Sequence, residues 1–304
     1  MKMIELGDSG EKIPVLGLGT WKLGADPEGN IEALRLGIRL GMRLVDTAEM
    51  YANEEIVGRA IEGQEIFLCT KVSPDHFRYD DVIKACDRSL RKLGRKQIDL
   101  YQLHWPNTSV PISETMRAME RLVDDGKIRY IGVSNFSIDE AIEAQEAMKR
   151  YKIVSNQVEY NILSRSIEDG LADFCKYEKM TAIAYSPLAR GVLFDQKHRA
   201  LARLLEEIGR AHGKSPGQVA LNWILSRGNV VAIPKAASAE HVRENAGAAD
   251  FELSAKELGE IGDFLKTHPQ EKPLSSRLTP AVKKSSTIWA KLMRYREGLR
   301  NRRG

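Results

Sequence analysis

Short apolar runs alternate along the chain with longer segments in which apolar residues recur at a helical period. The apolar runs are rich in Val, Ile and Leu, which is typical of strands buried on both faces of a parallel sheet. They lie at 15–20, 42–47, 65–71, 97–104, 128–134, 153–160, 180–186 and 229–235. The segments between them predict helices, for example at 29–41, 79–94, 112–127 and 137–150.

Residues at the predicted helix ends agree with this division. Serines lie where N-caps are expected, and glycines follow the last helical residues. These positions are Ser113, Ser137 and Ser238 for the caps, and Gly41, Gly94 and Gly126 for the ends.

Eight strand–helix units in about 250 residues predict an α/β fold of the (β/α)₈ barrel type. A doubly wound sheet is the alternative, but the GLGTWKLG segment after the first strand does not form the expected Gly-rich phosphate turn. Ahead of the barrel, residues 2–15 read as a β-hairpin around Gly-Asp-Ser-Gly, which we expect to close the barrel's N-terminal mouth. We therefore assign residues 1–266 to the barrel and residues 267–304 to a C-terminal extension.

The composition is that of an ordinary soluble protein, with 42% hydrophobic and 29% charged residues among 304. No run approaches the ~18 apolar residues of a spanning helix, and the first residues lack the features of a signal peptide. Cys69, Cys86 and Cys175 are odd in number and far apart. They indicate reduced thiols, with Cys69 in the core, and neither a disulfide framework nor a metal site. We expect a cytoplasmic protein.

Four residues with useful proton chemistry lie at or near the ends of three consecutive predicted strands. Asp46 ends the second strand, Lys71 the third and His104 the fourth, and Tyr51 follows Asp46 by five residues. A single lysine or histidine there is usually a solvated charge or a structural residue. Four compatible groups at the C-terminal rim of a barrel, however, predict a catalytic site.

The roles of these groups follow from their acid–base properties. A tyrosine hydroxyl, with an ordinary pKa of ~10, is a weak acid near neutrality, and a nearby ammonium lowers that pKa. We therefore predict Tyr51 as general acid, Lys71 as the group that adjusts its pKa, and Asp46 as the partner of Lys71. An imidazole at His104 can orient a carbonyl or relay the proton.

The sequence resembles the aldo-keto reductase superfamily from about residue 4 to residue 266. The resemblance is carried by GLGTW (17–21), VDTAEMYANEEIVGRAI (45–61), CTK (69–71), LHWP (103–106), GVSNF (132–136), NQVEYN (156–161), AYSPLARG (184–191) and IPKAASAEHVRENAGA (233–248). It implies a barrel that reduces aldehydes or ketones to alcohols with NAD(P)H. Hydride would come from nicotinamide C4 and the proton from Tyr51, in a tetrad with Asp46, Lys71 and His104.

The resemblance also implies a binding groove for the whole dinucleotide. Its positions are Ser134, Asn135 and Gln157 for the nicotinamide carboxamide, Tyr185 for stacking on the ring, Ser186, Leu188 and Gly191 for the pyrophosphate, Lys235 for the 2′-phosphate, Glu244 and Asn245 for adenine, and Gly19, Thr20, Ser238 and His241 for further contacts. Trp21 and Trp105 match residues of the family's substrate entrance. The alternative for these two is packing under loops.

Two departures bear on cofactor choice. The residue after Lys235 is Ala236, where a hydroxyl is common, and His241 stands where many members carry Arg. A bidentate guanidinium would thus be replaced by an imidazole, although Ser238 and Arg243 could compensate. We expect NADP(H), because Lys235 is retained and no carboxylate replaces it, with NAD(H) as the alternative.

The net charge of +4 arises in the last residues of the chain. Residues 283–304 carry a net charge of +7, so the rest of the chain carries −3. Apolar residues of this tail fall on one helical stripe, which consists of Ile288, Leu292, Tyr295 and Leu299. The favoured interpretation is a helix docked on the barrel or on a partner subunit. An interfacial membrane helix, a polyanion-binding arm, or a Trp289 that reaches the pocket are the alternatives.

The sequence therefore predicts a reductase of small carbonyl compounds that is a monomer or homo-oligomer, with no nucleic-acid partner. A second hypothesis is a cofactor-binding regulatory subunit, because the superfamily includes channel-associated members. A third is a protein that associates with membranes or nucleic acids through residues 283–304.

Overall fold

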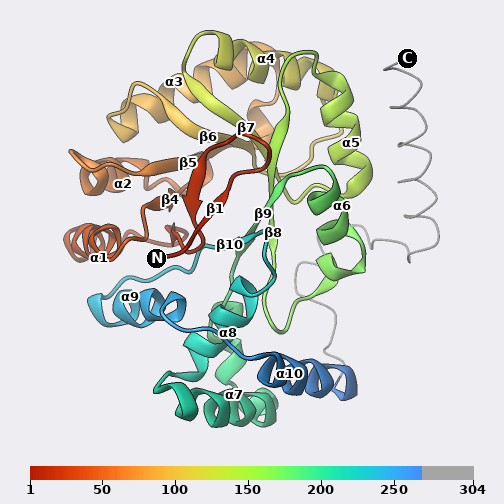
Figure 1. The fold of residues 1–304 in the computed structure, drawn as a ribbon. Coiled ribbons are helices and arrows are strands. Elements are labelled where there is room, and N and C mark those ends of the chain that lie inside the picture. Colours follow the sequence, from red (N-terminus) through yellow and green to blue (C-terminus); the bar gives the residue numbers. More distant parts are fainter. Residues whose placement is uncertain (269–304) are drawn as a thin grey trace.

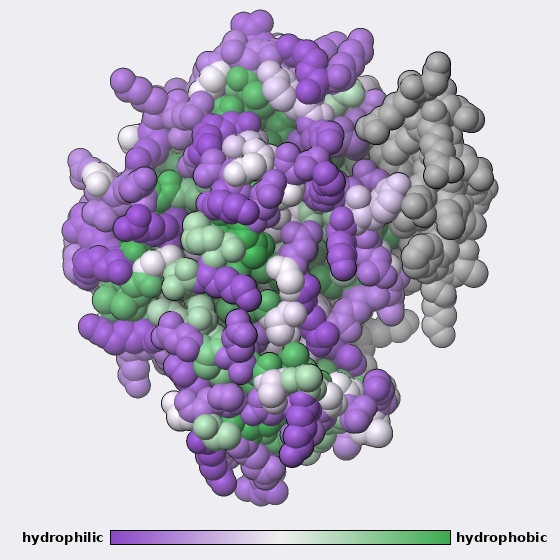
Figure 2. Space-filling view, viewed as in Figure 1, coloured by the Kyte–Doolittle hydropathy of each residue, from purple (hydrophilic) through white to green (hydrophobic). Residues whose placement is uncertain are grey.

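The computed structural model describes residues 1–268. The predicted tail helix and the proposed reach of Trp289 lie outside these residues. Among residues 1–268, no helix is long and apolar enough to cross a membrane. The hairpin side of the molecule presents a mostly hydrophilic surface, with hydrophobic residues in small separate groups (Figure 2).

Eight parallel strands form one sheet, in which each strand pairs with the next along the chain (Figure 1). They are β3 (Leu18–Gly19), β4 (Leu44–Asp46), β5 (Phe67–Val72), β6 (Ile98–Leu103), β7 (Ile128–Ser134), β8 (Ile153–Glu159), β9 (Thr181–Tyr185) and β10 (Val230–Ala232). The first and last strands also meet, because the Gly17 N–H donates to the Ala232 carbonyl at 2.8 Å and the Ala232 N–H donates to the Val15 carbonyl at 2.9 Å. The sheet is therefore closed, and the predicted (β/α)₈ barrel is confirmed.

Helices follow the strands and surround the sheet (Figure 1). They are α1 (Pro27–Arg39), α2 (Glu54–Ile61), α3 (Tyr79–Leu93), α4 (Ile112–Asp124), α5 (Ile138–Ala147), α6 (Leu171–Tyr177), α7 (Arg199–His212), α8 (Pro216–Leu225), α9 (Ala239–Ala246) and α10 (Ala255–Thr267). Short 3-10 turns are η1 (Glu49–Tyr51), η2 (Pro74–His76), η3 (Ser166–Asp169), η4 (Ala189–Phe194), η5 (Gln196–His198) and η6 (Gly247–Ala249). The three cysteines are buried, and none forms a disulfide.

The predicted helix ends are confirmed except at one cap. Ser137 caps α5 in a capping box, and Ser238 caps α9 by accepting from the His241 N–H. The predicted glycines Gly41, Gly94 and Gly126 all have positive φ at helix ends. Ser113 is wrong as the cap of α4, which begins at Ile112 with Pro111 before it. The Pro111 carbonyl accepts from the Glu114 N–H, so the first turn starts earlier than the serine suggested.

The N-terminal hairpin closes one end of the barrel, as predicted. Strands β1 (Met3–Glu5) and β2 (Lys12–Pro14) pair antiparallel, and Leu6 and Ile13 are fully buried in one cluster with inward-facing strand residues such as Leu100. The N–H of Gly7 donates to the Thr181 hydroxyl at 2.9 Å. Gly7 has φ +59°, and a Cβ there would lie 2.8 Å from the Lys179 carbonyl oxygen. This end is thus filled by side chains, and the opposite end is left for chemistry.

We expect Ile13→Ala to lower the free energy of unfolding by about 2–5 kcal/mol, because the substitution leaves a cavity in the closed end. The measurement is urea denaturation followed by circular dichroism. Turnover per folded molecule is expected to stay unchanged, since the hairpin lies opposite the catalytic rim. Wild-type stability of this variant would contradict the hairpin's role as a plug.

Candidate active site

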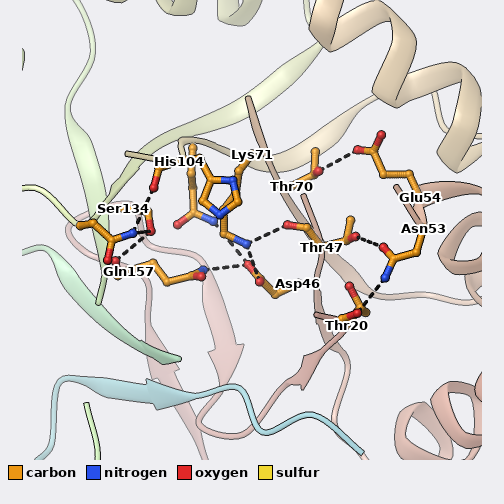
Figure 3. A network of polar contacts seen from close by, with 12 residues as sticks. Thr20, Asp46, Thr47, Asn53, Glu54, Thr70, Lys71, His104, Ser134 and Gln157 are labelled. Atoms are coloured by element: carbon orange, nitrogen blue, oxygen red, sulfur yellow. Dashed lines mark hydrogen bonds and ion pairs between the residues drawn. The ribbon is translucent and has the colours of Figure 1, made fainter. Parts of the chain in front are cut away.

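The four predicted catalytic residues converge at the C-terminal rim. Asp46 ends β4, Lys71 lies in β5, His104 follows β6, and Tyr51 ends η1. Parallel pairing places Asp46 opposite Cys69 and Lys71 opposite Gln102, so successive strand ends lie side by side. Figure 3 shows Asp46, Lys71 and His104 close together, and the Tyr51 ring lies against the last two, so the geometry agrees with the prediction that these groups share one site.

A buried ion pair lies at the centre of the site. Lys71 Nζ donates to Asp46 Oδ1 at 2.6 Å and to the Thr47 carbonyl at 2.8 Å, and both charged side chains are almost inaccessible to solvent. Burial alone would lower the pKa of Lys71, but the neighbouring Asp46 and Tyr51 together raise that pKa above its ordinary value. Lys71 is therefore a fixed ammonium, as predicted.

The second oxygen of the Asp46 carboxylate is held by two amides. Gln157 Nε2 donates to Oδ2 at 2.8 Å, and Gln102 Nε2 lies 3.4 Å from the same atom. Gln157 was predicted as a cofactor residue only, and Gln102 was not predicted. The available signal for Gln102 was its spacing, since it lies two residues before His104 and therefore on the same face of the strand.

Tyr51 lies against both Lys71 and His104. Lys71 Nζ is 5.1 Å from the centre of the Tyr51 ring, and the His104 ring meets it edge-on at 5.5 Å. Burial raises the pKa of the Tyr51 phenol, and Lys71 lowers it by a smaller amount, so the net pKa lies above the ordinary value. The expectation of a lowered pKa is thus wrong for the protein without ligand, although Lys71 acts in the expected direction. The phenol carries its proton.

His104 is neutral. Burial first, and then the Lys71 charge, lower the pKa of its imidazole to about 3. Its Nδ1 is buried with no hydrogen-bond partner among residues 1–268. A neutral imidazole with one N–H can donate a hydrogen bond to a carbonyl oxygen, which agrees with the orienting role expected for His104.

A cavity of about 910 Å³ extends from these residues toward α9. Predicted residues that line it are Gly19, Thr20, Trp21, Asp46, Tyr51, His104, Trp105, Ser134, Asn135, Gln157, Tyr185, Ser186, Leu188, Gly191, Lys235, His241, Glu244 and Asn245. Of the predicted site residues, Lys71 and Ser238 are not part of this lining. Lys71 is buried behind it, and the Ser238 hydroxyl caps α9.

The amide and hydroxyl groups predicted to bind nicotinamide are joined to one another. Asn135 Nδ2 donates to the His104 carbonyl at 3.1 Å and to Ser134 Oγ at 3.0 Å, and the Tyr185 hydroxyl donates to Asn135 Oδ1 at 2.9 Å. The Ser134 hydroxyl donates to the Gln157 carbonyl. This network holds the Tyr185 ring in the cavity wall, as a stacking platform requires.

The segment predicted to follow the pyrophosphate has an unusual backbone. Ser186, Ala189 and Arg190 have φ values of 49°, 50° and 56°, in the left-handed region that non-glycine residues rarely adopt. The Arg190 guanidinium lies 4.8 Å above the Trp21 ring, and Lys22 Nζ lies 4.5 Å from the same ring. Trp21, which is 38% exposed, therefore lines the cavity in contact with two cations. Sequence reasoning missed both Lys22 and Arg190.

Ala236 and His241, the two residues that depart from the family pattern, lie at or near the end of the cavity that contains Lys235. Lys235 and His241 are exposed and line the cavity. Ala236 is buried in a small apolar cluster with Ala33 and Val242, between α1 and α9. The Ala236 side chain therefore packs between helices and has no hydroxyl to donate to a phosphate.

Comparison with known proteins agrees with this geometry. The sequence model of the Aldo/keto reductase family matches residues 15–266. This chain belongs to the aldo/keto reductase family. It is 40% identical to methylglyoxal reductase YeaE of Escherichia coli strain K12, over 89% of this chain and 96% of that protein. Glyoxal reductase of Bacillus subtilis strain 168 is 37% identical, over 83% of this chain and 89% of that protein.

Solved structures of the family share the fold closely. The aldo/keto reductase of Klebsiella pneumoniae in complex with NADP and acetate has a TM-score of 0.78 and 38% identity, over 88% of this chain and 96% of that one. The residues of this aldo/keto reductase fit such a dinucleotide, because one cavity reaches from Tyr51 and His104 to the cationic side chain of Lys235 and the imidazole of His241.

The neutral state of His104 predicts a pH dependence of stability. At pH values between about 3 and the ordinary imidazole pKa of 6.5, His104 is protonated in the unfolded chain but neutral in the folded protein. The free energy of unfolding therefore falls as the pH falls through this window. We expect His104→Gln to remove up to about 1.4 kcal/mol per pH unit of that slope. Urea titrations at several pH values measure it, and an unchanged slope would exclude a buried neutral imidazole.

Proposed function

We propose that this aldo/keto reductase reduces small aldehydes and ketones with NADPH. The observation that carries the proposal is a protonated Tyr51 beside a buried Lys71–Asp46 pair and a neutral His104, in the wall of a cavity that extends to Lys235. Family membership and the reductase relatives support the same chemistry.

In this reaction the bound cofactor supplies the hydride that adds to the carbonyl carbon. Tyr51 gives its proton to the carbonyl oxygen, so that one hydride and one proton convert the carbonyl to an alcohol. The resulting Tyr51 phenolate is stabilised by the Lys71 ammonium. The His104 N–H donates a hydrogen bond to the carbonyl oxygen and holds it toward Tyr51. Asp46 keeps Lys71 charged and in place.

NADPH is proposed as the preferred cofactor because Lys235 lines the far end of the cavity as an exposed cation. The Klebsiella pneumoniae structure in complex with NADP supports this preference. His241 is proposed as a second contact to the 2′-phosphate, weaker than the guanidinium it replaces. The Ala236 side chain supplies no hydroxyl to that phosphate, so NADH is the alternative cofactor.

The proposed substrates are small dicarbonyl compounds. Two relatives are named for methylglyoxal and glyoxal, and this chain covers most of their length. Trp21, Met50 and Trp105 line the same cavity as Tyr51 and give it apolar walls. An intact tetrad favours an enzyme over the alternative of a regulatory subunit. Cytoplasmic location, oligomeric state and the role of the tail stay predictions.

We expect Tyr51→Phe to lower kcat for methylglyoxal reduction by about 10²–10⁴-fold, because it removes the proton donor. The measurement is NADPH oxidation followed at saturating methylglyoxal. NADPH affinity, measured by fluorescence titration, is expected to stay the same, since the hydroxyl is assigned to the substrate oxygen. Near wild-type turnover in Tyr51→Phe would refute the assignment.

We expect His241→Arg to increase the preference for NADPH over NADH by about tenfold, because a charged guanidinium hydrogen bond to phosphate adds affinity for NADPH alone. The measurement is the ratio of kcat/KM for the two cofactors. Lys235→Met is the opposing variant and should lower the same ratio. Equal changes for NADPH and NADH would show that neither side chain contacts the 2′-phosphate.

A further inference from the structure

The side chain of Asn53 joins the two loops that form the mouth of the site. It is 2% exposed and makes three hydrogen bonds. Its Oδ1 accepts from the Thr47 hydroxyl at 3.0 Å, and its Nδ2 donates to the Thr20 carbonyl at 2.7 Å and to the Leu23 carbonyl at 3.3 Å. Figure 3 shows this network continuing from the Lys71–Asp46 pair.

We propose that Asn53 is a positioning residue that fixes the Tyr51 loop, defined as residues 47–53, against Lys71 and against the entrance loop, defined as residues 20–23. This inference rests on the proposed function. Asn53 touches neither substrate nor cofactor in this assignment. It acts through the placement of the Tyr51 phenol and the Trp21 ring.

The Thr47–Asn53 hydrogen bond closes the Tyr51 loop at its base. Between these two residues the chain forms η1 and then Ala52, whose φ of 55° is left-handed, so the loop is tightly turned. The same Thr47 offers its carbonyl to Lys71 Nζ at 2.8 Å. A shift of Thr47 would therefore move both an acceptor of the ammonium and the anchor of the loop that carries the phenol.

The Nδ2 bonds of Asn53 hold the other loop. The Thr20 and Leu23 carbonyls flank Trp21 and Lys22, and the Thr20 N–H donates to the Asp46 carbonyl at 3.1 Å. One amide thus sets the separation between the entrance tryptophan and the catalytic tyrosine. Both loops start at strand ends that are neighbours in the sheet, and their side chains line the same cavity.

Asn53 precedes helix α2, but its side chain does not cap that helix within residues 1–268. Asn53 is the N-cap of α2, where asparagine usually accepts a hydrogen bond from the first turn. Its side chain makes no such bond within residues 1–268. The amide bonds only to the two loops, so substitution should loosen them more than it disturbs α2.

The chain offers a matched control in Asn222 of α8. Its side chain is 6% exposed, its Nδ2 donates to the Ala248 and Phe251 carbonyls at 2.9 and 2.7 Å, and its Oδ1 accepts from the Leu253 N–H at 3.2 Å. Asn222 is therefore also buried, with two carbonyl acceptors and one donor, but it is not part of the cavity lining. Its substitution reports the structural loss alone.

The test compares Asn53→Ala, Thr47→Val and the double variant with Asn222→Ala, in full-length protein. Active concentration is taken from NADPH fluorescence titration, and kcat and KM for methylglyoxal are measured from pH 5 to pH 12, so that the range includes the ionisation of a phenol whose pKa lies above its ordinary value. We expect Asn53→Ala to lower kcat by about tenfold or more, because small displacements of reacting groups are costly. Thr47→Val should lose less. The double variant should lose no more than Asn53→Ala alone.

The pH profile separates positioning from general destabilisation. The charged or titratable groups around Tyr51 are Lys71, Asp46, His104 and Tyr185. A phenol that moves away from Lys71 loses the interaction that lowers its pKa, so the alkaline decline of kcat should move to higher pH in Asn53→Ala. Asn222→Ala should lose stability but keep the wild-type kcat and pH profile.

Two results would overturn the proposal. One is an Asn53→Ala enzyme with wild-type kcat and pH profile. The other is an Asn222→Ala enzyme that loses kcat equally at equal active concentration. These results do not bear on the proposed function. That function is refuted only if the wild type does not reduce carbonyls or if Tyr51→Phe still reduces them.

Discussion

The site depends on the ion pair between Lys71 and Asp46. Each charge loses several kcal/mol of hydration on burial, and mutual attraction compensates only where geometry and further hydrogen bonds are good. Here Asp46 is approached by Lys71, Gln157 and Gln102, and Lys71 is also held by the Thr47 carbonyl. These donors come from β5, β8 and β6, so the pair is stable only when strands across the barrel are in register. The chemical site therefore requires the closed sheet.

The barrel and the four central residues could be predicted from sequence because both have local signals. Buried parallel strands appear as short apolar runs, and parallel strands end at one rim, so Asp46, Lys71 and His104 could be grouped by their positions along the chain. The resemblance to aldo-keto reductases added the residues along the cavity, most of which line it. Ser238 does not line the cavity, and its hydroxyl accepts a hydrogen bond at the start of α9, as the sequence also predicted.

What the sequence could not predict are the contacts that depend on tertiary distance. Asn53 bonds to the carbonyls of Thr20 and Leu23, and backbone carbonyls carry no sequence signal. The stacking of Arg190 on Trp21 depends on a left-handed backbone at Arg190, a conformation that sequence rarely indicates for a non-glycine residue. The net pKa of Tyr51 was wrong for a related reason. The charge of Lys71 is visible in sequence, but the burial that opposes it is a property of the fold.

The opposing effects of burial and of Lys71 on the pKa of Tyr51 favour reduction of a carbonyl. Reduction requires a phenol that carries its proton, and burial, by raising the pKa of Tyr51, keeps the free protein in that form. The same burial would disfavour the phenolate left after proton transfer if Lys71 were absent. Lys71 adds a positive charge that opposes this effect, and Asp46 prevents Lys71 from becoming neutral. In the proposed reaction the proton comes from Tyr51, and the neutral His104 adds no second positive charge beside it. The site thus starts in the state that reduction needs, and its one fixed cation stabilises the state in which reduction ends.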